Sequence, residues 1–539
     1  MSHTLPEIFP AESSIPDAYK IPSYIEQHEY LINGELRSWK GDLNPVMSPV
    51  FVKEGNEYKQ KVIGSTPLLT SAEAMKALDA AVNAHDLGKG LWPTMSVADR
   101  ISHVEKFLER MREKRGEVVM LLMWEIGKSL KDSEKEFDRT CDYILDTIKS
   151  LKELDRSSAK MVEDQGFMAQ IRRVPRGVAL CMGPFNYPLN ETFTTLIPAL
   201  IMGNTVVFKP AKFGVLLIKP LLEAFRDSFP PGVINIIYGK GRETVGAIME
   251  SGKLDVFAFI GTSKGANDLK KLHPKPHRLK AILGLDAKNP AIVLPDADLN
   301  TTVSECIMGS LSFNGQRCTA LKILFVHRSL VDDFIKKFNE EVEKLKCGMP
   351  WESGVNLTPL PEPGKTDFLK ELVEDAKKHG AKIMNDGGGE IQKTFFYPAV
   401  LYPVNDKMRV YYEEQFGPVV PIVPYDDVDD PMHYVINSNF GQQVSIFGKD
   451  SRTIAKLIDM FSNQVGRINV NTQSQRGPDS FPFNGRKDSA EGTLSVADAL
   501  RVFSIRTLVA TKSTDENKQI ISTIIKNRES LFLSTEYIF

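Results

Sequence analysis

A cysteine that directly follows a glycine-containing turn is the first feature of this sequence that could do chemistry. The stretch Phe313-Asn314-Gly315-Gln316-Arg317-Cys318-Thr319-Ala320 comes after a run with helical spacing at 302–312. A thiol placed there can be presented to a cleft. Most free cysteines are small buried apolar residues, but the positive charge of Arg317 would lower the pKa of the Cys318 thiol and raise its thiolate fraction. The stretch therefore predicts a nucleophile.

Length and composition indicate a soluble protein with several domains. The chain has 539 residues, of which 42% are hydrophobic and 25% are charged. This is too long for a single core, so we expect about two to four domains. The formal net charge of −2 provides no basic field that would attract nucleic acid or an anionic membrane. Small molecules are therefore the expected ligands, with no nucleic acid and no membrane partner.

The cysteines and the N-terminus point to a reducing compartment. Five cysteines are odd in number and widely spaced, and no Cys-x-x-Cys pair occurs among them (Cys141, Cys181, Cys306, Cys318 and Cys347). This pattern argues against a disulfide framework or a structural zinc, and no metal is expected. Residues 1–11 lack the apolar core of a signal peptide, and no run reaches the roughly 18 apolar residues that span a bilayer. We expect a cytoplasmic protein.

Strands and helices alternate through the middle of the chain. Short apolar runs typical of buried parallel strands occur at 178–182, 205–208, 233–238 and 256–260, with helical patterns between them at 193–201, 216–228 and 243–250. Each of these strands is followed by a loop rich in glycine, proline or lysine. Ligands of open parallel sheets bind at such carboxyl ends, so a cofactor crevice is expected. Glycine-rich loops follow strands in many folds, and no G-x-G-x-x-G occurs, so the pattern alone leaves the nucleotide site open.

The flanking segments extend the α/β pattern. The first seventy residues read as an irregular entry segment that contains one hairpin signal, Asn33-Gly34. Helices are expected from 71 to about 149, and a strand or hairpin at 161–173. A second α/β stretch has strands at 289–294, 323–326, 419–423, 465–470 and 502–509, with a helix at 330–345. Residues 515–539 read as a helix and a mobile end without an assigned function.

Five motifs, taken in order, are similar to those of the aldehyde dehydrogenase superfamily. Phe185-Asn186-Tyr187-Pro188 resembles its P-[WF]-N-[FY]-P segment, Lys209-Pro210-Ala211 its K-P-[SA], Phe259-Ile260-Gly261-Thr262 its F-T-G-S, Asn314-Gly315-Gln316-Arg317-Cys318 its nucleophile turn, and Glu414-Gln415-Phe416-Gly417-Pro418 its E-x-F-G-P. The resemblance runs from about residue 30 to residue 511, nearly the whole chain.

This resemblance implies a fold and an assembly. We expect an α/β fold with a Rossmann-type nucleotide-binding domain (1–160 and 174–285), an α/β catalytic domain (286–490) and a small β oligomerisation domain (161–173 and 491–514), followed by the tail at 515–539. Members of the superfamily assemble, so a homodimer or homotetramer is expected.

The resemblance also implies covalent catalysis. A thiolate at Cys318 would add to an aldehyde carbonyl, and the oxyanion would be held by the side-chain amide of Asn186 and the backbone N–H of Cys318. Hydride then passes to a nicotinamide, and water cleaves the resulting thioester to a carboxylic acid. The nucleophile Cys318 and the oxyanion donor Asn186 are therefore expected to come from two motifs that are far apart in sequence but meet in the fold.

The expected cofactor is NADP. Many NAD-preferring members carry a glutamate at the place of Lys212, whereas a lysine there, beside Lys209, offers charged donors to a 2′-phosphate. The alternative that Lys212 merely points to solvent stays open. The other cofactor contacts implied by the resemblance are Phe185, Gly241, Gly261 and Thr262, with Glu414 and Phe416 at the nicotinamide ribose.

Four further residues resemble the phosphate-binding set of the non-phosphorylating, NADP-dependent glyceraldehyde-3-phosphate dehydrogenases. They are Arg139, Tyr187, Arg317 and Arg476. Guanidinium groups pair bidentately with phosphate oxygens, so the expected substrate is glyceraldehyde 3-phosphate or a similar phosphorylated aldehyde.

One departure from the superfamily concerns the general base. Where the pattern E-L-G-G-K-N usually stands, this chain has Gly284-Leu285-Asp286-Ala287-Lys288-Asn289, with glycine at the position of the glutamate. Asp286 is the nearest carboxylate in sequence and is our candidate base, and a more distant carboxylate or unassisted water are the alternatives. The same gap leaves two other functions open. These are acyl transfer to a thiol such as coenzyme A, and a catalytically impaired relative.

Overall fold

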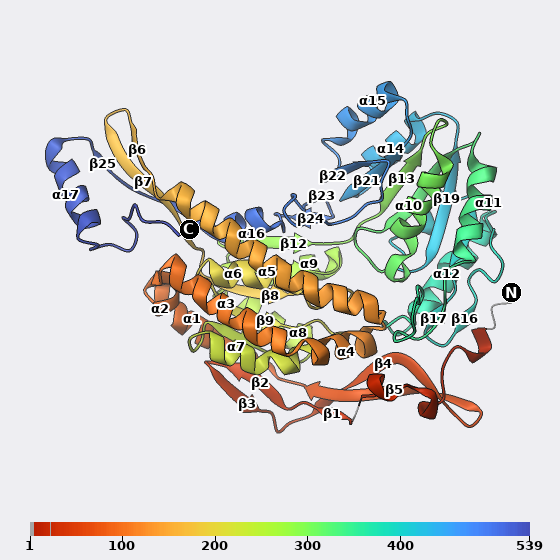
Figure 1. Ribbon diagram of the computed structural model, residues 1–539, viewed down its shortest axis with the longest axis horizontal. Coiled ribbons are helices and arrows are strands. Elements are labelled where there is room, and N and C mark those ends of the chain that lie inside the picture. Colours follow the sequence, from red (N-terminus) through yellow and green to blue (C-terminus); the bar gives the residue numbers. More distant parts are fainter. Residues whose placement is uncertain (1–4, 22, 539) are drawn as a thin grey trace.

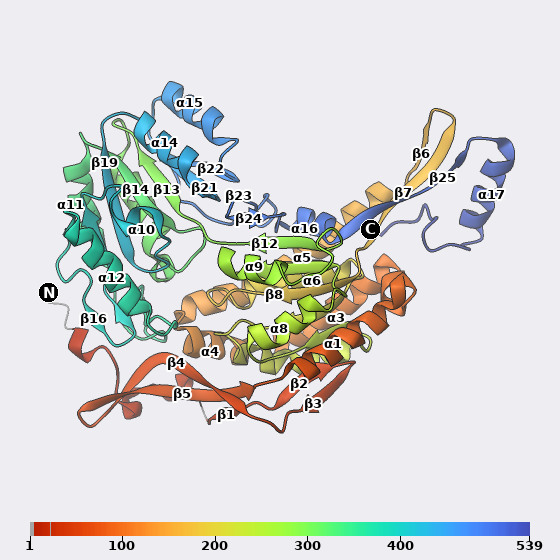
Figure 2. The same ribbon diagram turned by 180° about the vertical axis from the view of Figure 1, so that it is seen from behind.

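The computed structural model describes residues 5–21 and 23–538 and contains two large α/β layers, each built on its own sheet (Figure 1). A small third sheet projects from one end, and a long N-terminal ribbon runs beneath both layers (Figure 2). In these described ranges no helix is long and apolar enough to cross a membrane. The same ranges hold no group of three or more His, Cys, Asp or Glu side chains that could bind a metal ion.

The first layer is an eight-stranded sheet in the order β24-β12-β11-β8-β9-β10-β2-β3. Its strands are β2 (Glu29–Ile32), β3 (Glu35–Ser38), β8 (Val178–Met182), β9 (Thr205–Lys209), β10 (Ile234–Ile236), β11 (Val256–Ile260), β12 (Lys280–Gly284) and β24 (Ala490–Glu491). The five strands from β12 to β10 are parallel, which confirms the predicted parallel sheet. Their carboxyl ends share one edge, where the predicted cofactor loops lie.

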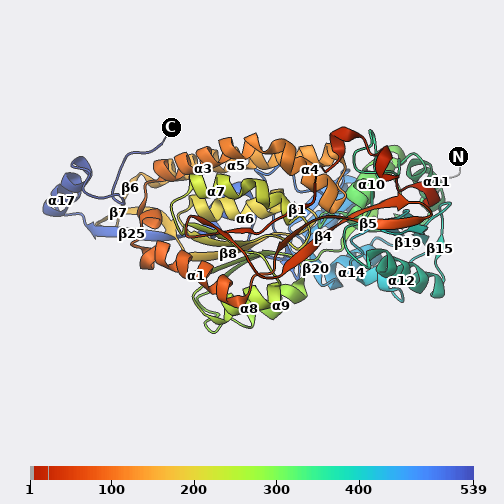
Figure 3. The ribbon, with the colours of Figure 1, turned by 90° about the horizontal axis from the view of Figure 1, so that it is seen from below.

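Helices cover both faces of this sheet (Figure 3). They are α1 (Ser71–His85), α2 (Leu91–Thr94), α3 (Val97–Glu113), α4 (Arg115–Ile126), α5 (Leu130–Ser158), α6 (Asn190–Ile201), α7 (Leu222–Ser228), α8 (Gly241–Glu250), α9 (Ser263–Lys270) and α16 (Val496–Val502). Helix α5 begins at Ser129, whose side chain accepts a hydrogen bond from the N–H of Asp132. Every residue of α6 is buried, so a charged side chain on that helix must find a partner inside the protein.

The second layer is a seven-stranded sheet in the order β15-β18-β19-β14-β13-β21-β22, parallel except for β15. Its strands are β13 (Asn289–Val293), β14 (Leu321–His327), β15 (Lys382–Ile383), β18 (Ala399–Tyr402), β19 (Val419–Tyr425), β21 (Gln443–Phe447) and β22 (Arg467–Val470). Its helices are α10 (Leu299–Leu311), α11 (Val331–Val342), α12 (Lys365–Lys378), α13 (Arg409–Tyr412), α14 (Asp429–Asn437) and α15 (Ser451–Phe461). Two short pairs complete it: β16 (Ile391–Gln392) with β17 (Phe395–Phe396), and β20 (Phe440–Gly441) with β23 (Arg486–Lys487).

The projecting sheet joins two segments that are far apart in sequence. Strands β6 (Met161–Asp164), β7 (Phe167–Pro175) and β25 (Ser504–Lys512) pair antiparallel in the order β25-β7-β6. The predicted hairpin at 161–173 and the late strand are thereby both found. Helix α17 (Asp515–Lys526) follows beside this sheet and buries none of its residues.

Two expectations need correction. The segment expected to supply oligomerisation strands over 491–514 forms a strand of the small sheet only from Ser504, because 496–502 fold as α16 and pack on α5 and α6. The first seventy residues are not irregular. Strands β4 (Leu43–Glu54) and β5 (Glu57–Pro67) form a long antiparallel ribbon, joined by β1 (Ile25–Glu26). Its prolines and lysines hid the alternating pattern of these strands.

Candidate active site

The cysteine turn is held in an unusual backbone conformation. After α10 ends, Phe313, Asn314 and Gly315 all have positive φ angles, of 49°, 55° and 70°. A Cβ atom at Gly315 would lie 2.7 Å from the carbonyl oxygen of Ser310, so only glycine fits there. The side chain of Asn314 fixes the turn, because it donates to the carbonyl of Thr358 at 3.0 Å and accepts from the N–H of Thr358 at 3.0 Å. Such strain persists only where the surroundings impose it.

Three side chains from the second layer hold Cys318 itself. Asn289 Nδ2 donates to the Cys318 carbonyl at 2.8 Å, and Lys322 Nζ donates to the same carbonyl at 3.1 Å. The side chain of Gln442 contacts the thiol and lowers its pKa. The half-buried thiol is therefore fixed at the start of β14, where its backbone cannot move freely.

The prediction that Arg317 lowers the pKa of the Cys318 thiol was wrong in its net direction. Burial is the largest influence and raises the pKa, and the negative charge of Glu191 adds to this. Lys322 and Arg476 act in the opposite sense but are outweighed. Arg317 directs Nη2 to the carbonyls of Met308 and Gly309, at 3.0 and 2.8 Å. The resting thiol is consequently held in its neutral form.

The loop that carries Asn186 touches the cysteine turn. Asn186 is buried, and its Nδ2 donates to the carbonyl of Gln316 at 2.8 Å. Gln316 stands two residues before Cys318, so this bond ties the amide to the cysteine turn. The structure therefore brings together the two predicted catalytic residues, from the end of β8 and the start of β14.

A buried ion pair supports that loop. Lys128 and Glu136 are both 0% exposed and bond to each other. Lys128 Nζ also donates to the Asn186 carbonyl at 2.7 Å and lies 3.6 Å from the centre of the Tyr187 ring. Glu136 Oε1 accepts from the N–H groups of Leu189 and Asn190, at 3.1 Å each, at the start of α6. The pair thereby sets the position of the loop from both sides.

Arg139 and Arg476 converge on one carboxylate. Arg139 makes a bidentate pair with Asp479, at 2.9 and 2.7 Å, and Arg476 Nε donates to the same carboxylate at 3.2 Å. Arg476 Nη1 bonds to Glu191, and its Nη2 donates to the carbonyl of Leu494 at 3.0 Å. The two predicted phosphate ligands are thus neighbours, and acidic groups already engage both.

Tyr187 and Arg317 belong to the same neighbourhood. The charges of Arg139 and Arg317 both act on the Tyr187 phenol, although burial is the larger influence and raises its pKa. The Nε atom of Arg317 is buried and has no hydrogen-bond partner in the described part of the chain. The four predicted phosphate ligands therefore lie in one charged cluster beside the cysteine.

The predicted cofactor residues lie at the carboxyl edge of the first sheet. Lys209 ends β9 and is buried, and burial lowers its pKa to about 8. Within the described residues, the one hydrogen bond of its Nζ goes to the carbonyl of Pro210, at 3.4 Å. Lys212 is exposed and lies 5.1 Å from the ring centre of Phe213. The rings of Phe185 and Phe416 pack edge to face, with centres 5.7 Å apart. The edge thus offers two ammonium groups and an aromatic wall.

Two helix N-termini open at the same edge. Gly241 is the first residue of α8, and Gly261-Thr262 precede α9, where Thr262 Oγ1 accepts from the N–H of Gly265 at 3.1 Å. Glu414, from the second layer, pairs with Lys322 and accepts from the N–H of Ala287 at 3.2 Å. Burial raises the pKa of Glu414.

The candidate base Asp286 is placed differently from the catalytic pair. Its Oδ2 accepts from the N–H of Ser263, the first residue of α9, at 2.7 Å. Its charge acts on Glu414, and it is not among the main influences on the Cys318 thiol. Gly284, the position of the missing glutamate, is the last residue of β12. The structure therefore places Asp286 at the cofactor loop.

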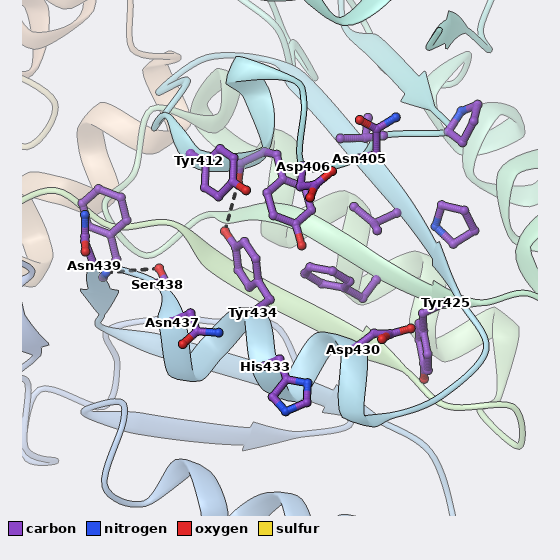
Figure 4. A pocket seen from close by; sticks show the side chains of 17 residues that line it. Asn405, Asp406, Tyr412, Tyr425, Asp430, His433, Tyr434, Asn437, Ser438 and Asn439 are labelled. Carbon is purple, nitrogen blue, oxygen red and sulfur yellow. Dashed lines mark hydrogen bonds between the residues drawn. The ribbon is translucent and has the colours of Figure 1, made fainter. Parts of the chain in front are cut away.

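A separate cavity of about 670 Å³ lies on the second layer, between α14 with the residues that follow it, β19 and the loop before α13 (Figure 4). Tyr434 stands in its wall and donates to the carbonyl of Tyr411 at 3.2 Å. None of the predicted site residues lines it. It is distinct from the cleft at Cys318.

Comparison with known proteins agrees with this geometry. The model of the aldehyde dehydrogenase family matches residues 49–509. The chain belongs to the aldehyde dehydrogenase family. This confirms the resemblance carried by the five motifs, and the predicted α/β fold with it.

Individual relatives share about a third of their residues or fewer with this aldehyde dehydrogenase. A protein of Zea mays named NADP-dependent glyceraldehyde-3-phosphate dehydrogenase is 30% identical over 488 residues, covering 89% of this chain and 94% of its own. A 3-sulfolactaldehyde dehydrogenase of Priestia aryabhattai is 28% identical over 472 residues, covering 87% and 94%. The solved NADP-dependent glyceraldehyde-3-phosphate dehydrogenase from Bacillus halodurans C-125, complexed with NADP, is 30% identical with a TM-score of 0.82, covering 90% of this chain and 100% of that one.

Several residues of this aldehyde dehydrogenase site were not predicted from the sequence. They are Lys128, Glu136, Glu191, Lys322, Gln442 and Asp479. Lys128 and Glu136 lie on polar, charge-rich stretches where a surface position is the default. Glu191 gave one usable signal, because it is the single charged residue in an otherwise uncharged helical run directly after the Asn186 motif.

Proposed function

We propose that this aldehyde dehydrogenase oxidises glyceraldehyde 3-phosphate, or a similar small phosphorylated aldehyde, to the carboxylic acid with NADP. The observation that carries the proposal is the cluster of Arg139, Arg476 and Arg317 beside Cys318. Two relatives described above carry this activity in their names. The relative that acts on 3-sulfolactaldehyde, named for a substrate with a sulfonate, also supports an anionic substrate.

The charges of the cluster favour an anion. Arg139 and Arg476 pair with two carboxylates, Asp479 and Glu191, whereas Arg317 donates to backbone carbonyls and has no salt bridge in the described residues. A phosphate that binds here must replace these carboxylates as the acceptor of hydrogen bonds from the guanidinium N–H groups. Because a dianion offers several oxygens in bidentate geometry, it can displace a carboxylate from such a fork.

The chain's own residues support covalent catalysis. Substrate binding and a neighbouring base must convert the neutral Cys318 thiol to the thiolate, which then attacks the aldehyde carbon. Asn186 Nδ2 and the N–H of Cys318 are proposed to hold the oxyanion. Asn289 and Lys322 hold the Cys318 carbonyl and so fix the peptide unit that follows the nucleophile. Bound NADP would supply the hydride acceptor.

The cofactor edge fits NADP. Lys209 is a buried ammonium group without a carboxylate partner in the described ranges, which suits a ribose or phosphate oxygen. Exposed Lys212 suits a 2′-phosphate, and the N-termini of α8 and α9 suit the pyrophosphate. Phe185 and Phe416 offer flat apolar surface to the nicotinamide side.

A second candidate function is acyl transfer to coenzyme A, and the observation that favours it is Gly284. A thioester handed to a thiol has less need of a carboxylate that activates water. We further propose that the protein acts in the cytoplasm as a homodimer or homotetramer, with the projecting sheet as the assembly surface.

Replacing Arg139 tests the substrate class. Arg139→Leu leaves Asp479 paired with Arg476, so the fold of the cluster is kept. We expect a loss of roughly 1.5–3 kcal/mol in kcat/KM for glyceraldehyde 3-phosphate and much less for glyceraldehyde, as for other hydrogen bonds to charged groups. Arg328→Leu, which breaks an exposed pair with Asp426, is the matched control. Equal losses on both aldehydes would assign Arg139 to the fold and refute the phosphate site.

A further inference from the structure

Hydrolysis of the thioester needs a base that the two obvious positions do not supply. Gly284 has no side chain, and a Cβ there would meet Leu494 Cδ1 at 3.3 Å. Asp286 has one oxygen bound to the N-terminus of α9. In the proposed function, the reaction nevertheless ends on a thioester that water must cleave. Another carboxylate beside Cys318 is therefore required for efficient turnover.

Glu191 is a carboxylate of the right kind in the right place. It stands in the first turn of α6, five residues after Asn186, and its N–H donates to the carbonyl of Tyr187 at 3.1 Å. Its side chain is 9% exposed. The oxyanion loop and Glu191 therefore belong to one rigid element, and that element touches the cysteine turn through the bond from Asn186 to Gln316.

One oxygen of Glu191 is fixed and the other is available. In the free protein Oε2 bonds to Arg476 Nη1, which holds the carboxylate in place. Oε1 has no hydrogen-bond partner in the part of the chain that the structure describes, and it is not among the fully buried unpaired atoms there. A carboxylate oxygen in that position can accept a hydrogen bond from a water molecule.

The electrostatics of the thiol point the same way. Of the acidic groups in the cluster, Glu191 is the carboxylate that acts on the Cys318 thiol, and Asp479 and Asp286 are not among the main influences. A charge that affects the thiol in this way must lie close to it, because interactions between charges weaken with distance. This influence and the bond from Asn186 to Gln316 together place Glu191 in the neighbourhood of the thiol.

We propose that Glu191 is the general base that deacylates Cys318, in place of the glutamate absent at 284. Water forms a bond to the thioester carbon while Oε1 takes its proton. The tetrahedral intermediate then expels the Cys318 thiolate as the carbon–sulfur bond breaks, and the carboxylic acid leaves. The assignment rests on the thioester chemistry of the proposed function and holds for any acyl group on Cys318.

The opposing interpretation is that Glu191 only neutralises Arg476. Arg476 has a further carboxylate partner in Asp479, at 3.2 Å, which it shares with Arg139. The two interpretations predict different effects of removing the Glu191 carboxylate on the deacylation of Cys318 when the acyl group carries no phosphate. A general base would be needed for that step, and a partner of Arg476 would not. An ester substrate isolates that step.

Hydrolysis of p-nitrophenyl acetate by the full chain, without cofactor, separates acylation from deacylation. The initial burst of nitrophenolate reports acylation of Cys318, and the steady rate reports deacylation. For Glu191→Gln we expect a burst of unchanged amplitude, a steady rate lower by roughly 10²–10⁴-fold, and acetyl-enzyme that accumulates by intact mass spectrometry. Glu191→Asp should recover part of the steady rate. Glu305→Gln is the matched control, because Glu305 bonds to Thr472 and Gln473 outside the catalytic pair.

Three results would overturn the proposal. They are an unchanged steady rate in Glu191→Gln, loss of its burst, or the collapse of the steady rate in Asp286→Asn instead. The ester assay is independent of the substrate class. A protein that shows this behaviour with the ester but does not oxidise glyceraldehyde 3-phosphate would lose the proposed function and keep the role of Glu191.

Discussion

At the scale of single residues, Cys318 is the proposed nucleophile and lies just before β14, in the second layer, whereas the predicted cofactor loops lie at the edge of the first sheet. Its carbonyl is held by Asn289 and Lys322, and its thiol faces the charged cluster. Replacing Cys318 by Ala should abolish hydride transfer and leave NADP affinity nearly unchanged, because the thiol forms the covalent intermediate but contacts the cofactor little. The checks are NADPH absorbance and calorimetric titration with NADP. A variant that kept more than a small residual rate would place the nucleophile elsewhere.

The raised pKa of the same thiol gives a pH prediction. Only the thiolate reacts with iodoacetamide, so the alkylation rate of Cys318 should rise with pH and reach its midpoint above the ordinary thiol pKa, since burial and Glu191 raise that pKa. In Glu191→Gln one of the raising influences is absent, so the midpoint should move to lower pH. Peptide mapping identifies the alkylated cysteine. A midpoint below the ordinary value in the wild type would contradict the electrostatics of the site.

At the scale of elements, the pair of Lys128 and Glu136 joins the start of α5 to the loop before α6. Lys128→Met leaves the carboxylate of Glu136 buried and unpaired, so the free energy of unfolding should fall by about 3–5 kcal/mol. The double variant Lys128→Met with Glu136→Gln keeps an acceptor for Leu189 and Asn190 without a buried charge. It should regain part of the loss in urea denaturation. If the double variant were less stable than the single one, the ion pair itself would be the stabilising contact.

The elements also show what the sequence could and could not predict. The parallel strands β8, β9 and β11 were predicted within about a residue, because continuous apolar runs between glycine loops have few other solutions. β12 was missed because Lys280–Gly284 is short and begins with a lysine.

The residues of the candidate site also fall into those that the sequence could predict and those that it could not. Cys318 and Asn186 could be predicted because each belongs to a local motif. Glu191 and Asp479 could not, because their roles depend on Arg476 and Arg139, which come from distant segments. The net effect of burial on the Cys318 pKa likewise depends on side chains from four separate stretches of chain.

At the scale of the whole molecule, the projecting sheet exposes several large apolar side chains to solvent. Val162, Phe167, Ile505 and Leu508 are 49%, 50%, 50% and 57% exposed, a concentration typical of protein interfaces. Under the proposed assembly, Leu508→Lys should therefore shift the protein from the dimer or tetramer toward monomer in light scattering coupled to size exclusion. Leu531→Lys, also at an exposed apolar position near the C-terminus, is the control. An unchanged mass for Leu508→Lys would remove β25 from the interface.

The central claim is that this aldehyde dehydrogenase hydrolyses its own thioester after oxidising a phosphorylated aldehyde. The most direct measurement gives the purified protein NADP and glyceraldehyde 3-phosphate, and follows NADPH by absorbance with and without coenzyme A. We predict sustained NADPH formation without inorganic phosphate or coenzyme A, an unchanged rate when coenzyme A is added, and 3-phosphoglycerate as the product. NADPH formation that required coenzyme A, or none under either condition, would contradict the account.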